Sequence, residues 1–332
     1  MKFSLIVCTY MRPKSLLSLL NSVKLQTLYP DEILIIDGST NLDSEQIIKE
    51  NDFENLKYYR VNDNNRGLTK QRNYGVNLVD ALIDVVCFLD DDTELESDYF
   101  EQVINVFMTN SEIVGVGGTS VNENRWFKLE DGSKLNKNKY YFFEGFAVKE
   151  GLRNVVRNYL GLQSTLLPGL MPDFSHGRTN GYPLDDKIHE VDLLMGMSFS
   201  FRKEIFDKIK FSIYFEGYGL YEDADFSLRA LRYGKNVINT AAKLNHYHEA
   251  SGRPNKYKYG KMVIRNGWYV WRVKYPNPNF TARLKWNLTA LLLTIIRFSN
   301  VFNTNQKKEA LSESFGRVVG WLSLVFNKPK VE

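Results

Sequence analysis

Three consecutive aspartates stand where an apolar run of the sequence ends. Asp90, Asp91 and Asp92 follow VVCFL (85–89), a short, uncharged and β-branched stretch that is typical of a buried strand. Adjacent anions repel one another, and a strand-end Asp-x-Asp suits a divalent cation, because Mg²⁺ binds one or two carboxylates together with substrate phosphates. The triplet therefore indicates metal-assisted phosphate chemistry, and the alternative is a solvated turn before the next helix.

Two other uses of clustered aspartates fit the spacing less well. The stretch has neither the central glycine nor the closing glutamate of an EF-hand loop. Aspartyl-phosphate enzymes carry Asp-x-Asp-x-Thr, whereas Thr93 comes one place early. A calcium loop is excluded, and a phosphatase is disfavoured.

A second acidic group and a histidine pair occur further along the chain. In FEGYGLYEDADFSLRALRYGK (215–235), Glu222, Asp223 and Asp225 fall in the first turn of a predicted amphipathic helix, and Asp225 is expected to pair with Arg229 four places on. A carboxylate such as Asp223 can act as a general base. HYHEASGR (246–253) contains two of the four histidines, and imidazole together with carboxylates suits Mn²⁺ as well as Mg²⁺.

Alternating strands and helices must position these groups. Strands are predicted at 3–10, 32–37, 56–61 and 84–89, and helices at 13–26, 41–52 and 68–82. This order predicts an α/β fold with a mostly parallel sheet, whose ligands bind outside the carboxyl ends of the strands. Thr9, Asp37 and the aspartate triplet should therefore meet at one edge.

Composition limits the class of protein. The chain has 332 residues, 43% hydrophobic and 25% charged, as in an ordinary globular protein. Cys8 and Cys87 lie in apolar runs, which predicts buried thiols in a reducing compartment and no zinc site. The N-terminal sequence does not have the features of a signal peptide, so a cytoplasmic location is expected.

Residues 122–190 are polar and turn-rich and predict a long excursion on the acceptor side.

The C-terminal segment is basic and apolar. Residues 256–332 carry 14 basic and 3 acidic side chains, a net charge of +11, whereas residues 1–255 carry 29 and 36, a net charge of −7. Two apolar runs, 286–302 and 315–326, are short for a membrane span. With Trp271, Trp286 and Trp321 they predict helices lying on a membrane surface, and the alternative is a structural cover for the catalytic domain. Nucleic-acid binding is disfavoured, because no recognition motif is present.

Seven motifs in order resemble the family 2 glycosyltransferases, which have the GT-A (Rossmann-like) fold. They are IVCTYMRP, IIDGST, NNRGLTKQRNYG, FLDDDTEL, MGMSFSFRKEIF, GYGLYEDADFSLRALRYGK and HYHEASGR. The resemblance covers residues 1–255, which it implies form a GT-A domain, and leaves 256–332 as a helical extension. It also implies that Ser251 and Arg253 close the last motif.

The resemblance implies a role for each matching residue. Asp223 would be the catalytic base, and Asp90, Asp92 and His246 would hold the metal, with His248 in reserve. The nucleotide-sugar would contact Thr9, Tyr10, Arg12, Asp37, Arg66, Gly67, Lys70, Arg72, Asp90, Asp91, Gly118 and Glu222. Asp37 also fits an Asx-turn, Lys70 a solvated helix face, Gly118 a bulged strand, and Glu222 a helix cap.

The implied activity is that of an inverting, metal-dependent glycosyltransferase using Mn²⁺ or Mg²⁺. The donor would be a UDP- or dTDP-sugar, since Asp37 could accept the N3–H of either base. The acceptor would be a hydroxyl of a glycan or lipid-linked glycan, at the inner face of the cell membrane in cell-surface polysaccharide synthesis. The alternative is a nucleotide-sugar-binding scaffold that has lost turnover.

Overall fold

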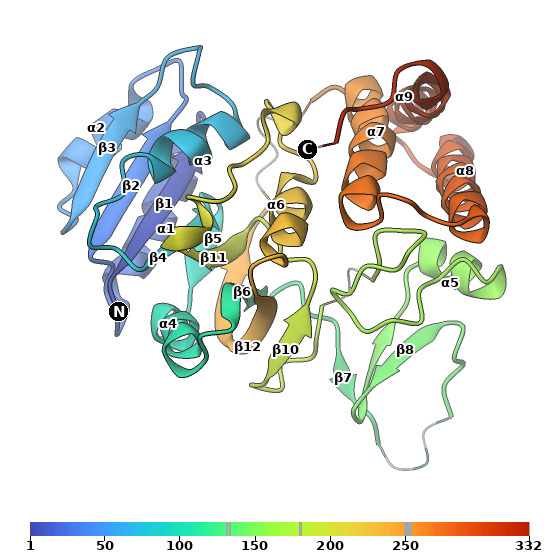
Figure 1. Ribbon diagram of the computed structural model, residues 1–332, viewed down its shortest axis with the longest axis horizontal. Helices are drawn as coiled ribbons and strands as arrows, with labels where there is room; N and C mark the ends of the chain where they lie inside the picture. Colours follow the sequence, from blue (N-terminus) through green and yellow to red (C-terminus); the bar gives the residue numbers. More distant parts are fainter. Residues whose placement is uncertain (131, 133, 179–180, 249–253, 332) are drawn as a thin grey trace. The chain divides into compact units, whose positions relative to one another are not determined.

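The computed structural model describes residues 1–130, 132, 134–178, 181–248 and 254–331 (Figure 1). The chain divides into two compact units. The first comprises Met1–Asn124 and Leu184–Arg253, and the second comprises Arg125–Pro183 and Pro254–Glu332.

A central sheet of nine described strands forms the first unit. Its strands are β1 (Phe3–Thr9), β2 (Glu32–Asp37), β3 (Leu56–Arg60), β4 (Val85–Asp90), β5 (Thr93–Leu95), β6 (Ile113–Ser120), β10 (Ile188–Val191), β11 (Ser198–Arg202) and β12 (Lys235–His246). Their order is β10-β12-β6-β11-β4-β1-β2-β3, and β5 pairs with β12. Six strands, β1 to β4, β6 and β12, run in one direction, while β5, β10 and β11 oppose them. The predicted α/β class with a mostly parallel sheet is confirmed.

Helices cover both faces of this sheet, which explains why its central strands are apolar throughout. On one face α1 (Pro13–Lys24) buries Leu16, Leu19, Leu20 and Val23 at helical spacing, beside α4 (Tyr99–Thr109). On the other face lie α3 (Leu68–Val76) and α6 (Glu222–Ala230). A methyl group added to Gly75 of α3 would come within 2.9 Å of Ile6, so this glycine allows the helix to approach β1 closely.

The strand register brings the predicted edge together. Thr9 pairs with Asp37 across β1 and β2, and Cys8 pairs with Asp90 across β1 and β4. One boundary differs from the prediction, because α3 ends at Val76 and does not continue to Leu82. The side chain of Asp80 accepts the backbone N–H of Leu82, a local bond that competes with helix formation. Of the two cysteines predicted to be buried, Cys87 is buried and Cys8 is half-buried.

The second unit combines a small sheet with four helices. Its elements are β7 (Phe127–Lys128), β8 (Tyr140–Phe143), β9 (Phe146–Lys149), α5 (Leu152–Tyr159), α7 (Lys256–Lys274), α8 (Phe280–Asn303) and α9 (Lys307–Phe326). Helices α7 and α9 meet backbone to backbone, since a methyl group on Gly260 or Gly316 would overlap a carbonyl oxygen of the other helix. Within the described residues, none of the helices has both the length and the apolar character that a membrane span requires.

The tryptophans expected at a membrane interface lie elsewhere. Trp271 and Trp286 are buried and stack with ring centroids 5.3 Å apart, and the Trp271 indole N–H donates to the Asp173 carbonyl. Trp321 donates to Asn287. Trp271 and Trp286 therefore pack inside the second unit, and the prediction that the helices of 256–332 lie on a membrane surface stays a prediction.

Candidate functional site

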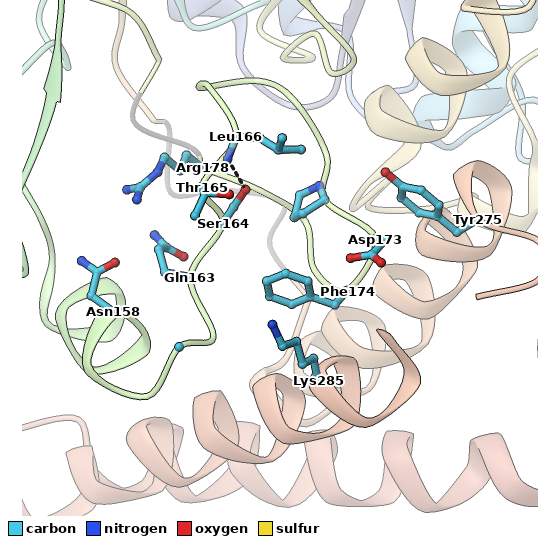
Figure 2. A pocket seen from close by; sticks show the side chains of 12 residues that line it. Asn158, Gln163, Ser164, Thr165, Leu166, Asp173, Phe174, Arg178, Tyr275 and Lys285 are labelled. Atoms are coloured by element: carbon cyan, nitrogen blue, oxygen red, sulfur yellow. Dashed lines mark hydrogen bonds between the residues drawn. The ribbon is translucent and has the colours of Figure 1, made fainter. Parts of the chain in front are cut away.

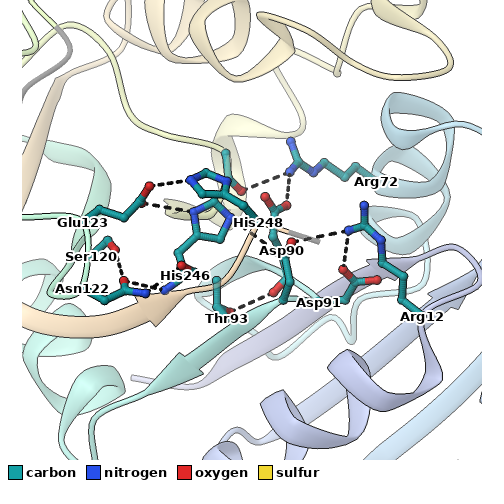
Figure 3. A network of polar contacts seen from close by, with 12 residues as sticks. Arg12, Arg72, Asp90, Asp91, Thr93, Ser120, Asn122, Glu123, His246 and His248 are labelled. Atoms are coloured by element: carbon teal, nitrogen blue, oxygen red, sulfur yellow. Dashed lines mark hydrogen bonds and ion pairs between the residues drawn. The ribbon is translucent and has the colours of Figure 1, made fainter. Parts of the chain in front are cut away.

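The aspartate triplet ends β4 and opens the turn to β5, where each carboxylate has a different environment (Figure 3). Asp91 is buried and accepts hydrogen bonds from the Thr9 hydroxyl at 2.7 Å and from Arg12 at 2.9 Å. The same Arg12 nitrogen lies 3.7 Å from Asp92. One arginine therefore neutralises two of the three adjacent anions and links β1 to the end of β4.

Arg72 of α3 connects the triplet to the start of α6. Its side chain is 2% exposed and forms an ion pair with Glu222, while its second terminal nitrogen lies 3.6 Å from Asp90 and 3.2 Å from the Gly196 carbonyl. Glu222 is buried too, and its Oε2 has no hydrogen-bond partner among the described residues.

Asp90 at the end of β4, Asp92 in the turn after it and His246 at the end of β12 come together. One ligand atom from each lies within 4.8 Å of the others, and His246 Nε2 is 3.4 Å from Asp92. The other imidazole nitrogen, Nδ1, faces Glu123 at 3.3 Å (Figure 3). Because a carboxylate only accepts hydrogen bonds, Glu123 holds the proton on Nδ1 and leaves Nε2 directed toward the aspartates. Two carboxylates and an imidazole in this arrangement fit Mn²⁺ or Mg²⁺.

The environment raises the pKa of several acidic groups. Burial raises the pKa of Asp91 to about 6, although Arg12 and Thr9 oppose the shift. Partial burial and the charge of Asp92 raise the pKa of Asp90 against the effect of Arg72. Burial also raises the pKa of Glu222, with Arg72 again opposing. For His246, burial opposes protonation, but the hydrogen bond to Asp92 together with the negative charges of Asp90, Asp92 and Glu123 raises the pKa. The site concentrates more negative charge than its arginines neutralise.

Asp223 lies in the first turn of α6, as predicted. Its Oδ2 accepts the backbone N–H of Gly196 at 2.9 Å, and its Oδ1 accepts that of Ala224 at 2.8 Å. The Gly196 carbonyl in turn accepts from Arg72. Gly196 thus links Asp223, the proposed base, to Arg72, whose guanidinium lies 3.6 Å from Asp90. Asp225 pairs with Arg229 at 2.5 Å, which confirms that prediction.

Asp37 is fully buried, and both of its carboxylate oxygens are already engaged. Oδ1 accepts the backbone N–H of Ser39 at 2.7 Å, the Asx-turn contact, and Oδ2 accepts the Tyr58 hydroxyl at 2.5 Å. Both contacts stiffen this strand end, and a nucleobase would use a remaining lone pair. A base-binding role for Asp37 stays a prediction.

The helix start at α3 is held by main-chain contacts. Gly67 has a φ of 120°, and the next residue donates to the Gly217 carbonyl. Arg66 bonds the Gly38 carbonyl at 2.6 Å, and Lys70 lies 3.0 Å from Glu216. The three residues line one border of the site near the strand ends. Their predicted contacts with a diphosphate are untested.

Gly118 lies inside β6, opposite a bulge in β12. Gly117 pairs with Ile238 and Thr119 with Lys243, so β12 carries extra residues at this point. A methyl group on Gly118 would come within 2.7 Å of Tyr99 and of the Ala242 carbonyl. Packing against the bulge is therefore sufficient to account for this glycine. Tyr10, by contrast, is exposed at the strand edge.

Residues 4–163 match the family model described as "Glycosyl transferase family 2". This part of the chain belongs to glycosyltransferase family 2. The matched region includes the aspartate triplet, Arg12 and Arg72. Asp223 and His246 lie beyond it, and Ser251 and Arg253 fall outside the described residues.

One curated relative and two solved structures are similar to this chain. "Glucosyl-dolichyl phosphate glucuronosyltransferase" of Haloferax volcanii is 34% identical over 125 residues, which cover 36% of this chain and 39% of the relative. One structure of S. aureus TarS is 17% identical to this chain, with a TM-score of 0.47, and the match covers 92% of this chain and 46% of that one. A structure of TarS residues 1–349 is 18% identical, with a TM-score of 0.48, and the match covers 98% of this chain and 81% of that one. These TM-scores are too low to support an activity. The chain spans well under half of the curated relative it matches.

Three contributors to the family 2 site were missed in the sequence. Glu123 and Gly196 lie in segments that connect strands, far in sequence from the residues they contact. Gln71 donates from its side-chain amide to the carbonyls of Thr9 and Ile36 and so clamps the ends of β1 and β2. Gln71 stands directly before Arg72 in the motif NNRGLTKQRNYG, and this position in the motif could have indicated that Gln71 belongs to the site.

Proposed function

We propose that the protein is an inverting glycosyltransferase that moves a sugar from a UDP- or dTDP-sugar to a hydroxyl of a glycan or lipid-linked glycan. The observation that carries the proposal is a continuous polar network. It runs from the metal-type group of Asp90, Asp92 and His246 through Arg72 and the Gly196 loop to Asp223. Membership of residues 4–163 in family 2 supports the same reaction class.

The reaction is a single displacement at the anomeric carbon. The acceptor hydroxyl oxygen forms a bond to that carbon, the bond to the diphosphate oxygen breaks, and the diphosphate leaves with the electron pair. A Mn²⁺ or Mg²⁺ ion held by Asp90, Asp92 and His246 would supply positive charge for the leaving diphosphate. Asp223 accepts the hydroxyl proton as general base. Attack opposite the leaving group inverts the anomeric configuration.

Other residues of the chain orient these groups. The two backbone N–H donors on Asp223 fix its carboxylate, leaving lone pairs for a substrate hydroxyl. Arg72 holds Glu222 and approaches Asp90, so it sets the distance between the start of α6 and the end of β4. Arg12 and Thr9 keep Asp91 in place beneath the two metal-type carboxylates.

The proposal is tested by a thermal-shift panel of UDP, dTDP, GDP and ADP, and of UDP- and dTDP-sugars, with and without Mn²⁺. Ligand binding to the native state raises Tm, by roughly 5–10 °C at a ligand concentration of 100 Kd. We expect a shift for a uridine or thymidine diphosphate that requires Mn²⁺. A protein that binds the nucleotide sugar but transfers nothing to any acceptor is instead a scaffold, and a protein that responds to none of the ligands contradicts the proposal.

We further propose that the second unit docks on the inner face of the cell membrane. The similar Haloferax volcanii protein carries a dolichyl phosphate name, which supports a lipid-linked acceptor. Helices α8 and α9 each expose an apolar stripe at alternating spacings of three and four residues. The stripes are Leu284, Leu288, Leu291, Ile295, Phe298 and Phe302 on α8, and Leu311, Phe315, Val318, Leu322 and Val325 on α9. Apolar surface of this kind, beside a net charge of +11 over 256–332, fits an anionic lipid surface.

Replacing Leu288 and Ile295 by glutamate is expected to release the protein from membranes. The two side chains are 42% and 54% exposed, so the change removes apolar surface and adds like charge to an anionic surface without entering the core. The measurement is flotation of the full chain with vesicles containing anionic lipid, at low and high salt. We expect the unmodified chain to float at low salt and the variant to sediment.

The matched control places the same two charges at exposed polar positions of the same helix, Thr281 and Asn303. This control should float almost as well as the unmodified chain. If all three proteins stay in the soluble fraction, or if the apolar stripes bury each other in a dimer detected by sedimentation, the membrane role is wrong.

A further inference from the structure

The imidazole of His246 belongs to two groups of metal-ligating side chains. Among the described residues, two sets of three such side chains have ligand atoms that all lie within 4.8 Å of one another. One is the metal-type group of Asp90, Asp92 and His246. The other consists of Glu123, His246 and His248, and we call it the histidine-rich group. The proposed sugar transfer gives the histidine-rich group as a whole no role.

The cavity of the second unit offers no comparable set of ligands. It has a volume of about 590 Å³, and Figure 2 shows Asp173 and Lys285 among the side chains on its wall. Within its described lining, Asp173 is the only carboxylate, and there is neither histidine nor cysteine. Metal-ligating side chains of the described chain therefore gather in the first unit.

Glu123 lies between the two imidazoles of the histidine-rich group. Its Oε2 is 3.3 Å from Nδ1 of His246, and its Oε1 is 2.5 Å from Nε2 of His248 (Figure 3). The centroids of the two imidazole rings are 4.1 Å apart. Tetrahedral ligands at a Zn–N distance of about 2.0–2.1 Å are roughly 3.3 Å from one another. The three side chains thus have the types and approximate spacing of zinc ligands.

Backbone contacts fix the turn that brings these imidazoles together. The Asn122 side chain donates to the His246 carbonyl at 2.9 Å and accepts the His246 N–H at 3.0 Å. Tyr247 donates its N–H to the Asp92 carbonyl at 3.0 Å. His248 has a φ of 52°, a left-handed conformation that residues other than glycine seldom adopt and that is common at ligand sites. The fold therefore holds the two ligands close before any ion binds.

The histidine-rich group is accessible from solvent. The side chains of Glu123 and His248 are 39% and 56% exposed, and that of His246 is 11% exposed. A cation can therefore enter from solvent, with a water molecule as its fourth ligand. Two imidazoles and one carboxylate suit Zn²⁺ better than Mg²⁺, which prefers oxygen ligands. Neither cysteine takes part.

His246 can serve only one of the two groups at a time. A neutral imidazole carries one proton and has one nitrogen free to bind a cation. In the metal-type group that nitrogen is Nε2, and the proton on Nδ1 faces Glu123. With a cation on Nδ1 the proton lies on Nε2, which is 3.4 Å from Asp92 and donates to it. The metal-type group then loses its imidazole ligand.

We propose that the histidine-rich group is a second, regulatory metal site, which binds Zn²⁺ and thereby weakens the binding of Mn²⁺ to the metal-type group. The zinc site follows from the ligand set alone. The competition rests on the proposed function, because it requires the metal-type group to hold the catalytic cation.

The test is calorimetric titration of the full chain with Zn²⁺ alone. In His248→Asn the imidazole ligand is lost, so we expect Kd for Zn²⁺ to rise roughly a hundredfold or more, beyond the cost of losing an outer-shell partner. The side chain is exposed, so Tm of this variant should be unchanged. Asp92→Asn changes only the metal-type group and should bind Zn²⁺ with nearly normal affinity.

His189→Asn is the matched control. His189 also lies beside a carboxylate, 3.0 Å from Asp185, but no third ligand completes a group there within the described residues. This variant should bind Zn²⁺ normally. In the unmodified protein, saturating Zn²⁺ should raise Kd for Mn²⁺ roughly tenfold or more, and in His248→Asn it should not.

The zinc site is overturned if Zn²⁺ does not bind, or if binding survives in His248→Asn and is lost in Asp92→Asn, which would place the ion in the metal-type group. Mn²⁺ affinity that Zn²⁺ leaves unchanged overturns the competition. Zn²⁺ binding that requires His248, in a protein that binds no Mn²⁺, would support the zinc site and contradict the metal dependence of the proposed function, and with it the competition.

Discussion

Replacement of Asp223 by asparagine should lower sugar transfer by about two orders of magnitude or more while nucleotide-sugar binding persists. General-base catalysis contributes roughly 10²–10⁴-fold, and asparagine cannot take up the hydroxyl proton. The amide oxygen can still accept the Gly196 N–H, so the contact that joins α6 to the loop is retained. The measurement is single-turnover transfer at saturating donor, alongside donor Kd by calorimetry.

Asp207→Asn is the matched control, because Asp207 is an exposed aspartate of the same unit. It should transfer sugar at the normal rate. If Asp223→Asn keeps full turnover, the base is Glu222 or another group, and the proton-acceptor role proposed for Asp223 is wrong. A fall in transfer accompanied by an equal loss of donor binding would mean that Asp223 positions the donor.

Asp92→Asn is expected to abolish Mn²⁺-dependent nucleotide binding and to reduce transfer about a hundredfold or more. A metal ion that stabilises the leaving group is worth several kcal/mol in the transition state. The apo protein should keep or raise its Tm, because Asp92 adds to the repulsion that Asp90 experiences and Arg12 retains Asp91 as a partner. Mn²⁺ titration and thermal melts of the variant separate these two effects.

Glu123→Gln is expected to weaken Mn²⁺ binding less than Asp92→Asn does, because Glu123 contacts His246 and is not one of the three proposed metal ligands. Glutamine can donate to His246 as well as accept from it, so it no longer fixes the proton on Nδ1. Changes of this kind typically cost 10–100-fold in metal affinity. Glu45→Gln, on α2 (Asp43–Glu50) beside Lys49, is the control and should leave Mn²⁺ affinity unchanged. Full transfer by the unmodified enzyme in excess chelator would rule out the metal role of all these residues.

The sequence was sufficient for the part of the fold built from local patterns. Strands β1, β2 and β4 are short apolar runs, and α1 has apolar residues at helical spacing, so these elements were predictable. The meeting of Thr9, Asp37 and Asp90 also followed, because parallel strands end at one edge. Proximity of side chains here is a consequence of topology.

Contacts across long sequence distances were not predictable in this way. Glu123 and Gly196 act through a side chain and a backbone amide that the chain brings together only in three dimensions. The stacking of Trp271 on Trp286 was not predictable, because an amphipathic pattern does not show which element covers an aromatic ring.

The position of β11 has a consequence for the order in which the chain can fold during synthesis. This strand sits between β4 and β6 and is made of residues Ser198–Arg202, far downstream of both neighbours. The layer β3-β2-β1-β4 can form early, but β6 has no place in it until β11 has left the ribosome. Until then the apolar edge of β4 is open to other chains, which favours aggregation of the nascent protein. About the first two hundred residues must be protected, by a chaperone or by rapid synthesis, before the sheet can close.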